Sequence, residues 1–417
     1  MQIRYQISQN CSQKMKINKC RICKSTRLTK IFNLGNLVYT GIFPKSKNTK
    51  VPSGSLSLIH CRNCKLLQLE NNFNSKIMYG SNYGYMSSLN SSMEKHLKVK
   101  SKNLIRKYDL NKNKNILDIG SNDGTFLKYF SNKNNLFACD PTIFKFKKHY
   151  KKNIKLITKF FSSDHFKSKK FNLISSIAMF YDLPDPFKFA KDVKSILDDN
   201  GIWHIELSYM PLMVNMNSYD TICHEHLEYY SLKSLKYLMD MVGLKIIKIS
   251  FNDINGGSIA IDVAKKDSVY REVSTKIKSI LHVENKKKYN DINTQKKFFL
   301  NCKKNKTLLV NLLKKLKKNN KIVYGYGAST KGNVILQYCR IKDNLINKIV
   351  EINKFKYNKY TPGTKIKIIS ESEAKLINPD YYLVLPWHFK KNIIEREKKY
   401  LKKGGKLIFP LPKIQIV

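Results

Sequence analysis

Residues 115–127 read NILDIGSNDGTFL, and this segment guides the interpretation of the rest of the chain. The run Ile116–Ile119, apolar except for Asp118, predicts a buried strand, and Gly120 and Gly124 predict a turn that leads into a helix. Backbone N–H groups at the start of such a helix are free to bind a ligand. The spacing is D-x-G-x-x-x-G, and Asn122 stands where a G-x-G-x-x-G dinucleotide site has its middle glycine.

Acidic residues at the ends of two strands favour S-adenosylmethionine over a dinucleotide. Asp118 lies where the sulfonium and the amino-acid part would bind, and Asp140, 22 residues later in LFACDPT, is placed for the ribose hydroxyls. The residues that we expect to bind the cofactor are Asp118, Gly120, Ser121, Asn122, Gly124, Asp140 and Pro141. The alternative is that the two acids only cap helices, as short acidic side chains often do.

Two C-x-x-C pairs, Cys20–Cys23 and Cys61–Cys64, predict a zinc site near the N-terminus. Each pair can bend through a knuckle, so that four thiolates surround one ion. The 37 residues between Cys23 and Cys61 exceed the usual spacing of about 15–20, and they must form a hairpin or loop of their own. A four-thiolate site has no open position for water, so this zinc would be structural. The alternative is two unrelated pairs of buried thiols.

The order of strand and helix signals predicts three domains. Strands and helices alternate from about residue 95 to 265 and again from KIVYGYGAS at 321–329 to GGKLIFPLP at 404–412, which predicts two mostly parallel sheets. A helix-leaning connector with an amphipathic helix at 303–318 precedes the second series. We therefore expect an α/β protein with a zinc-ribbon-like module (1–75), a class I methyltransferase Rossmann-like domain (76–265) and a C-terminal Rossmann-like α/β domain (266–417).

Composition indicates a large globular protein and excludes a small disulfide scaffold. Hydrophobic residues make up 42% of the 417 residues, and 78 Lys and Arg against 30 Asp and Glu give a net charge of +48. Such a charge is typical of proteins that bind nucleic acid or membranes. However, the lysines are spread through every segment beside Asn and Ile, so we expect solvated lysines and no stable nucleic-acid partner.

The cysteines and the N-terminus indicate a cytoplasmic location. Outside the two pairs, five cysteines are scattered, unlike the framework of a secreted protein: Cys11, Cys139, Cys223, Cys302 and Cys339. Residues 1–16 lack the apolar stretch of a signal peptide. No run of 18 apolar residues occurs, so we expect no membrane span.

The segment SYDTICHEHLEYY at 218–230 places His224, Glu225 and His226 together. The histidines are two residues apart and not four, as H-E-x-x-H metal sites require, so acid–base chemistry fits better. Glu225 can orient or polarise a histidine. The alternative is that the histidines are satisfied in a core or turn. Tyr83 and Tyr85, in YGYMSS, precede the first strand of the methyltransferase series and can fold over the cofactor mouth, or only pack there.

A third motif, GYGASTKG at 325–332, follows a strand in the C-terminal series. Gly325 and Gly327 suit a turn around an anion, and Lys331 near the next helix start suits a phosphate or diphosphate. The motif is not a Walker A loop, in which the lysine follows the last glycine. Plain turn chemistry is the alternative.

These motifs in this order resemble the three-domain nucleotide-sugar C-methyltransferases, which use S-adenosylmethionine to methylate a carbon of keto-deoxysugars. The resemblance runs almost from end to end, through CRICKS…CRNCKLL, YGYMSS, ILDIGSNDGTFL, HEH, NGGS and GYGASTKGN…YTPGT…VLPWHF…GGKLIFPLP. It implies that His226 is the catalytic base, with Glu225 beside it, and that tyrosines before the first methyltransferase strand, such as Tyr83 and Tyr85, line the sugar site.

Two departures from the antibiotic-sugar members leave the sugar open. Cys223 stands where many members have a tyrosine, and FYDLPDP at 180–186 replaces a stretch that often holds a histidine. The sequence is closer to homologues from surface-polysaccharide gene clusters. We expect base-catalysed enolisation and methyl transfer on a nucleotide-linked keto-deoxysugar by a monomer or small homo-oligomer. The alternatives are an O- or N-methyltransferase of a glycan precursor and a zinc-ribbon protein that binds or modifies RNA.

Overall fold

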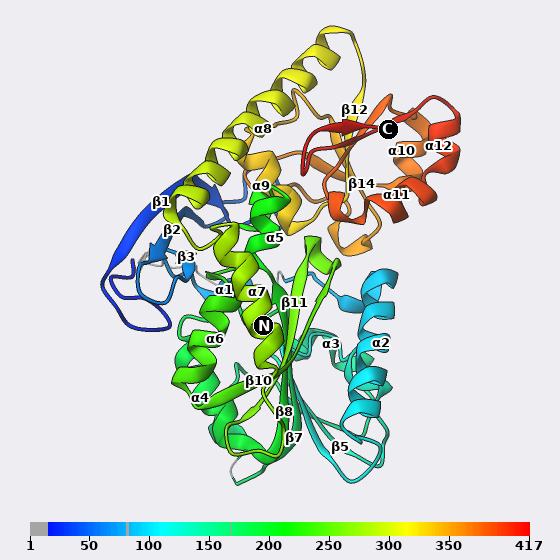
Figure 1. Cartoon of the computed structure of the whole chain (residues 1–417). Helices are drawn as coiled ribbons and strands as arrows, with labels where there is room; N and C mark the ends of the chain where they lie inside the picture. Colours follow the sequence, from blue (N-terminus) through cyan, green and yellow to red (C-terminus); the bar gives the residue numbers. More distant parts are fainter. Residues whose placement is uncertain (1–15, 81–82, 167) are drawn as a thin grey trace.

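The computed structural model describes residues 16–80, 83–166 and 168–417, which form three sheets with their helices (Figure 1). Cys11 and almost all of the 1–16 stretch used in the signal-peptide argument lie outside these residues. Within the described part of the chain, every helix is too short or too polar to cross a membrane.

The central sheet has seven strands in the order β10-β11-β8-β7-β4-β5-β6. Their bounds are β4 Asn115–Ile119, β5 Asn135–Cys139, β6 Ile154–Ile157, β7 Phe171–Ile177, β8 Leu197–Ser208, β10 Leu244–Asn252 and β11 Ser258–Lys265. β11 is antiparallel to both of its neighbours, and the other neighbouring strands run parallel. The expected mostly parallel sheet is confirmed, and NILDI forms β4, an interior strand between β7 and β5.

Helices cover both faces of this sheet, because its strands are apolar on both sides. α2 (Ser91–Lys107) lies on one side, and α4 (Pro186–Ile196) and α6 (Leu232–Met241) lie on the other (Figure 1). Ile116 packs in the cluster under α2, whereas the next residue, Leu117, packs with α4 and α6, as the two-residue period of a strand requires. The remaining helices near this sheet are α1 Ser75–Met78, α3 Ile143–Phe146, α5 Met210–Asn215 and α7 Ser274–Lys286.

The C-terminal sheet has six strands in the order β14-β13-β12-β15-β16-β17, all parallel except β17 at the edge. Its strands are β12 Val323–Tyr326, β13 Lys348–Glu351, β14 Lys367–Ser370, β15 Tyr381–Val384, β16 Lys406–Phe409 and β17 Gln415–Ile416. Its helices are α8 Ile292–Lys318, α9 Thr330–Tyr338, α10 Glu371–Ile377, α11 Lys390–Arg396 and α12 Lys398–Lys402. The predicted amphipathic helix at 303–318 is the second half of α8.

The N-terminal sheet combines distant parts of the chain. β1 (Leu28–Val38), β2 (Ser53–Cys61) and β3 (Leu67–Leu69) are joined by β9 (Glu228–Tyr229), in the antiparallel order β1-β2-β3-β9. β9 follows the HEH segment directly and pairs with β3. The zinc-ribbon-like module is therefore completed by a strand from the predicted methyltransferase segment.

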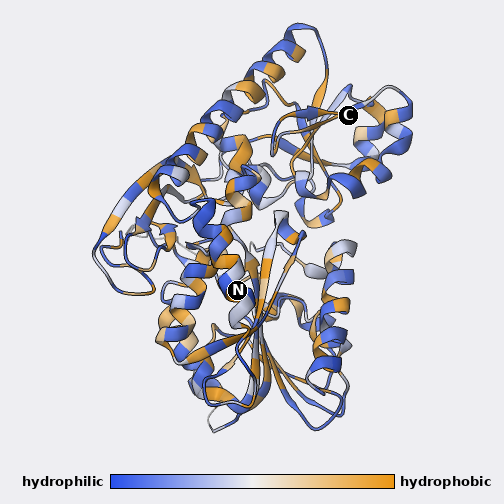
Figure 2. Ribbon diagram, viewed as in Figure 1, coloured by the Kyte–Doolittle hydropathy of each residue, from blue (hydrophilic) through white to orange (hydrophobic). Residues whose placement is uncertain are grey.

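One hydrophobic cluster joins the N-terminal sheet to the C-terminal domain through α8. The ring of Phe32 on β1 stacks on Phe299 at 4.3 Å between centroids, and Phe298 is buried beside them. Hydrophobic and hydrophilic residues alternate along α8 (Figure 2), and the buried ones include Leu309 and Leu313. Because α8 packs on both parts, the N-terminal module and the C-terminal domain share a core.

Candidate active site and zinc site

The four cysteines of the two C-x-x-C pairs converge on one point. Their sulfur atoms all lie within 4.8 Å of one another, with Cys20 and Cys64 at 3.4 Å and Cys23 and Cys61 at 3.5 Å. A tetrahedral zinc with Zn–S bonds of about 2.3 Å places its sulfurs about 3.8 Å apart, so the group fits zinc. With four cysteine ligands such a zinc has no open coordination position for water, so its role is structural.

The two knuckles have the same backbone geometry. Lys24 and Lys65, the residues after each pair, adopt left-handed φ values of 56° and 65°. Their N–H groups donate to the carbonyls of Cys20 and Cys61, each at 3.0 Å. This turn aims both sulfurs of a pair to the same side, as the spacing predicted.

The turn after β4 has the conformation that its glycines allow. Gly120, Asn122 and Gly124 have φ values of 75°, 52° and 76°, in the left-handed region. A Cβ at Gly124 would lie 2.7 Å from a ring carbon of Tyr150. The Tyr150 hydroxyl lies 2.7 Å from Ser121 Oγ and donates to the Asn122 carbonyl at 2.8 Å, so this ring supports the turn from below.

Gly124→Ala is expected to weaken S-adenosylhomocysteine binding at least tenfold and to lower the unfolding temperature, because both the backbone and Tyr150 must shift. Gly404→Ala is the matched control: Gly404 also has a positive φ of 89°, but a Cβ there meets nothing within 4 Å. Calorimetric titration and thermal unfolding of both variants measure the effects. Equal affinities in Gly124→Ala and Gly404→Ala would contradict a binding role for the turn.

Asn122 links the turn to the YGYMSS segment. Its side-chain Oδ1 accepts from the Ser87 N–H at 3.0 Å, and its Nδ2 donates to the Tyr85 carbonyl at 3.1 Å. The Ser88 N–H donates to Asp123 at 2.9 Å. The segment therefore lies over the turn, as the sequence predicted. The side chain of Asn122 makes two hydrogen bonds to this segment that a glycine could not make.

Asp118 is buried at the end of β4 and accepts from Ser175 Oγ at 2.6 Å. Burial, with smaller effects of the nearby Asp140 and Asp123 carboxylates, raises the pKa of Asp118 to about 7. The carboxyl group of Asp118 therefore titrates nearer to neutral pH than an ordinary aspartate.

The affinity for S-adenosylhomocysteine is expected to rise about tenfold from pH 6 to pH 8 if the ligand ammonium binds ionised Asp118. Below pH 7 the protein must release the Asp118 proton to bind, and above pH 7 it need not. Calorimetry at several pH values, in buffers of different protonation enthalpy, measures both affinity and proton release. Asp118→Asn should abolish the slope, and a slope unchanged by this substitution would contradict the assignment.

Asp140 holds the loop between β5 and α3. Its Oδ1 accepts from the N–H and the hydroxyl of Thr142, both at 2.6 Å, and its Oδ2 accepts from the Asn122 N–H at 2.9 Å. The loop-capping alternative thus describes part of its role. A carboxylate has about four acceptor positions, so capacity for a ribose hydroxyl remains, and the ribose contact stays a prediction. Pro141 follows in the same loop and is partly exposed.

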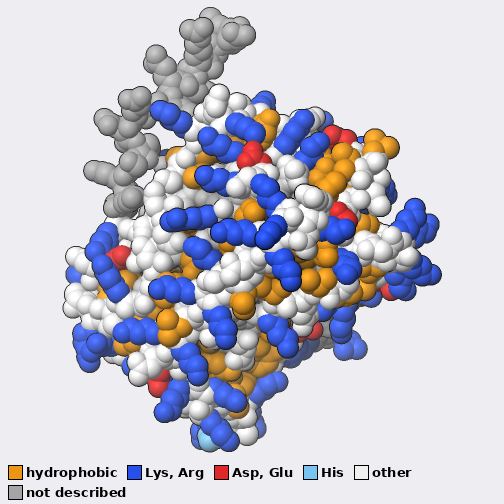
Figure 3. Space-filling view, turned by 90° about the horizontal axis from the view of Figure 1, so that it is seen from above, with side chains coloured by type: hydrophobic (Ala, Val, Ile, Leu, Met, Phe, Trp, Pro, Cys, Tyr) orange, Lys and Arg blue, Asp and Glu red, His pale blue; other side chains and the backbone are white. Residues whose placement is uncertain are grey.

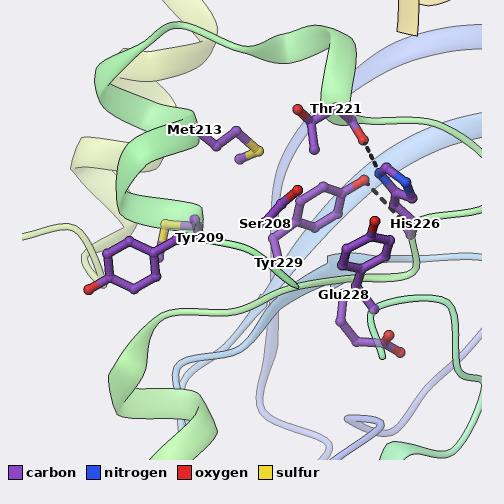
Figure 4. Close-up of a pocket in the computed structure, with 9 residues that line it drawn as sticks. Ser208, Tyr209, Met213, Thr221, His226, Glu228 and Tyr229 are labelled. Atoms are coloured by element: carbon purple, nitrogen blue, oxygen red, sulfur yellow. Dashed lines mark hydrogen bonds between the residues drawn. The ribbon is translucent and has the colours of Figure 1, made fainter. Parts of the chain in front are cut away.

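His226 is held in one tautomer. Its Nδ1 lies 2.8 Å from the Thr221 carbonyl, which can only accept, so Nδ1 carries the proton and Nε2 keeps its lone pair (Figure 4). Nε2 has no hydrogen-bond partner among the residues that the structure describes. Burial, and then the positive charge of Lys331, lower the pKa of His226 to about 3, so the ring is neutral at neutral pH.

His224 and His226 point to different places. His224 is fully buried and its Nε2 donates toward the carbonyls of Leu37 and Gly54, at 3.1 and 3.4 Å, in the N-terminal sheet. The rings of Tyr39 and Phe73 lie at 4.7 and 4.8 Å from its ring. The alternative of a histidine held in the core therefore describes the Nε2 side of His224, whereas its buried Nδ1 has no hydrogen-bond partner among the described residues.

Glu225 is not the group that orients His226, because the Thr221 carbonyl occupies Nδ1. Glu225 lies instead near Asp182, which accepts from the Tyr79 hydroxyl at 2.7 Å. Asp182 Oδ1 and Glu225 Oε2 are buried and have no hydrogen-bond partner in the described chain. Burial raises the pKa of both carboxyl groups. Two unpartnered acidic oxygens are suited to the hydroxyl groups of an acceptor.

Of the two tyrosines predicted from YGYMSS, Tyr83 is nearer to this acidic pair. Its ring lies 5.4 Å from that of Tyr79, and its hydroxyl pKa is raised by burial and then by Asp140 and Asp182. Tyr83 thus stands between the predicted cofactor acid and the acceptor acids. Tyr85 is 47% exposed and contributes its carbonyl to Asn122.

The GYGASTKG motif lies against the methyltransferase domain. Gly325 and Gly327 are closely packed, since a Cβ would lie 2.2 Å from Ile349 at the first and 2.8 Å from Pro386 at the second. Packing accounts for Gly325, and packing together with a left-handed φ of 82° accounts for Gly327. Lys331, in the first turn of α9, donates to the Asn255 carbonyl of NGGS at 2.7 Å. A diphosphate contact stays a prediction, and Lys331 is the motif residue that faces the HEH segment.

Several residues of this junction could not be predicted from the sequence. Asp220 accepts from Trp387 Nε1 at 2.8 Å, and the charge of Lys331 acts on Asp220 and on the partly buried His388. Trp387 and His388 belong to the VLPWHF motif, whose spacing alone indicates no chemistry. Tyr79 and Asp182 were missed because neither stands in a spaced motif.

A cavity of about 10 Å³ lies beside His226 (Figure 4). It is lined by Tyr181, Ser208, Tyr209, Met210, Met213, Thr221, His226, Glu228 and Tyr229. This space holds about one water molecule, so the acceptor must reach His226 from another side. The Tyr181 ring lies 4.3 Å from the His226 ring, and Asp182 is the next residue in the sequence after Tyr181.

Three family models match the chain in order. They are described as "Putative zinc binding domain" over residues 20–79, "Methyltransferase domain" over 93–249 and "C-methyltransferase C-terminal domain" over 253–412. A curated relative, the C-methyltransferase NovU of Streptomyces niveus, is 26% identical over 412 residues, 96% of this chain and 97% of the relative. The resemblance and the expected class I methyltransferase fold are confirmed.

Solved methyltransferase structures resemble part of the chain. A SAM-dependent methyltransferase from Aquifex aeolicus is 14% identical, with a TM-score of 0.33, over 43% of this chain and 98% of that one. The magnesium protoporphyrin IX methyltransferase of Synechocystis PCC 6803, with bound SAM, is 9% identical, with a TM-score of 0.34, over 46% of this chain and 88% of that one.

Proposed function

We propose that this chain, an S-adenosylmethionine-dependent methyltransferase with the three domains of the C-methyltransferases, methylates a carbon of a nucleotide-linked keto-deoxysugar. The observation that carries the proposal is the fixed tautomer of His226, whose Nε2 lone pair has no partner among the described residues while Nδ1 is held by Thr221. Methylation of carbon needs a base that removes a proton beside a ketone, whereas a neutral amine acceptor needs no such base.

In this mechanism His226 Nε2 removes the proton from the carbon next to the ketone, and Asp182 and Glu225 accept hydrogen bonds from sugar hydroxyls. Asp118, Asp140 and the glycine turn would hold S-adenosylmethionine, whose sulfonium methyl group is electrophilic and whose sulfur would leave as the thioether of S-adenosylhomocysteine when the carbanion takes the methyl group. Tyr83 and the segment over the turn exclude water from the reacting groups. Holding both reactants in line supplies a large share of the acceleration.

An anionic substrate also suits the electrostatics. With a pKa of about 3, His226 is a weak base, because of its burial first and the charge of Lys331 second. A diphosphate beside Lys331 would offset its charge and raise the pKa of His226 toward the range of an effective base. The proposal therefore places the nucleotide diphosphate between the methyltransferase segment (76–265) and the C-terminal segment (266–417).

The distribution of basic residues gives the RNA alternative little support. On the face in Figure 3, lysines and arginines are scattered among polar and hydrophobic side chains and form no single stripe. A nucleic-acid site needs a concentrated basic surface. We propose a cytoplasmic enzyme of surface-polysaccharide biosynthesis.

The test is incubation with methyl-labelled S-adenosylmethionine and a panel of nucleotide keto-deoxysugars, followed by NMR of the product. The proposal expects a new methyl group bonded to carbon next to the former ketone. A methyl group on oxygen or nitrogen would refute the proposal and support the O- or N-methyltransferase alternative. Labelling of RNA with no labelled sugar would overturn the substrate class.

A further inference from the structure

Arg21, the second residue of the first zinc knuckle, is buried with 2% of its surface exposed. Its hydrogen bonds go to the end of β3 and the turn after it: Gln68 Oε1 at 3.3 Å, the Leu69 carbonyl at 2.6 Å, the Asn71 carbonyl at 3.1 Å and Asn72 Oδ1 at 2.7 Å. The guanidinium group is planar and rigid, so these four acceptors fix its position.

The remaining nitrogen of the guanidinium, Nε, faces Glu228 Oε1 at 3.4 Å. Glu228 is also buried, at 2%, and begins β9 two residues after His226. Its carboxylate oxygens accept no hydrogen bond within the described part of the chain. Burial raises the pKa of Glu228, and the nearby Arg21 guanidinium is the main group that lowers it, so Arg21 is what favours the ionised carboxylate. Removing one partner of such a pair leaves a buried charge uncompensated, which is strongly unfavourable.

The backbone beside Glu228 is tied to the active site. The N–H groups of Leu227 and Glu228 both donate to the Tyr181 carbonyl, at 2.7 and 3.1 Å, and the Tyr181 ring touches His226. A shift of Glu228 therefore moves the residues on either side of the His226 ring.

We propose that Arg21 is a positioning residue that couples the zinc knuckle to His226 through Glu228. The proposal rests on the proposed function for the role of His226, but the coupling itself does not. With zinc in place, Cys20 and Cys23 fix the backbone on both sides of Arg21, and Arg21 fixes the start of β9. The zinc module thus holds the base in place, in addition to stabilising its own fold.

The second knuckle supplies a matched control. Arg62 has the same place in CRNC as Arg21 in CRIC, but its exposed Nε donates to Thr29 Oγ1 at 2.8 Å, away from the HEH segment. Arg21→Met and Arg62→Met are compared with the wild type for zinc content, S-adenosylhomocysteine affinity, kcat and KM, and amide hydrogen exchange.

We expect Arg21→Met to retain one zinc per chain and to bind S-adenosylhomocysteine with an affinity within about twofold of the wild type. The amide hydrogens of Leu227 and Glu228 should exchange at least tenfold faster than in the wild type. Its kcat should fall by about 10²-fold, the scale of a base displaced by about 1 Å, with little change in KM. Arg62→Met should match the wild type in every measurement. Unchanged exchange at Leu227 and Glu228 in a folded, zinc-containing Arg21→Met protein would overturn the coupling.

If Arg21→Met fails to fold, Arg21→Met with Glu228→Gln removes the uncompensated charge. This double variant should fold and still show fast exchange at residues 227–228; slow exchange would overturn the proposal. Exchange is independent of turnover. A wild type that methylates no nucleotide sugar, with the exchange result as expected, would refute the proposed function and leave the coupling intact.

Discussion

His226→Ala is expected to lower methyl transfer by about 10²–10⁴-fold, the usual contribution of a general base, while S-adenosylhomocysteine affinity changes little. The reason is the tautomer: Thr221 holds the Nδ1 proton, so Nε2 is the group that can accept one. Initial rates with the nucleotide keto-sugar, and calorimetry with S-adenosylhomocysteine, measure the two effects separately.

Exchange with heavy water gives an independent measurement of the same step. Wild-type protein with S-adenosylhomocysteine and the keto-sugar should incorporate deuterium at the acidic carbon, and His226→Ala should not. His149→Ala, a change at an exposed histidine, controls for the loss of an imidazole. Undiminished methylation by His226→Ala would refute the mechanism, and because His224 is enclosed by the N-terminal sheet, it would favour the O-methyl alternative over a second histidine base.

Local patterns predicted the parts of the fold that depend on neighbouring residues. The cysteine pairs, the glycine turn and the alternation of strands and helices each follow from short-range geometry, and the structure shows all three. The pairing of β9 with β3 joins residues 228–229 to residues 67–69. A two-residue strand has no periodicity, so no pattern in the sequence could reveal this pairing.

The candidate site was predictable in type but not in detail. The HEH segment suggested one cluster, but a bend sends His224 into the N-terminal sheet and leaves His226 beside Tyr181. Glu225 was paired with the wrong neighbour because adjacency in sequence does not imply contact in an irregular segment. Asp182 could not be assigned to the site from the sequence, because its contact with Tyr79 exists only in the folded chain.

The second large effect is expected from Cys61→Ser. This variant should lose its zinc, and its free energy of unfolding should fall by about 3 kcal/mol or more. Zinc supplies about 10–16 kcal/mol to the folding of isolated zinc-finger peptides, and here Cys61 shares a core with the methyltransferase domain, which retains part of the stability. A loss of about 3 kcal/mol lowers the unfolding temperature by about 6–12 °C for a domain of 150–250 residues. Elemental analysis and thermal unfolding measure the two changes.

Cys302→Ser separates loss of a ligand from loss of a buried thiol. Cys302 is as buried as Cys61, but it lies in α8, outside the four-cysteine group, with its sulfur 3.5 Å from Asn217 Oδ1. It should therefore retain one zinc per chain and unfold near the wild-type temperature. Adding a chelator should destabilise the wild type and Cys302→Ser alike, and should affect Cys61→Ser little, because that variant has already lost the ion. If Cys61→Ser instead keeps its zinc content and its unfolding temperature, the four sulfurs do not bind the ion and are only buried thiols, and the N-terminal module is held by its sheet, by Arg21 and by the core that it shares with α8.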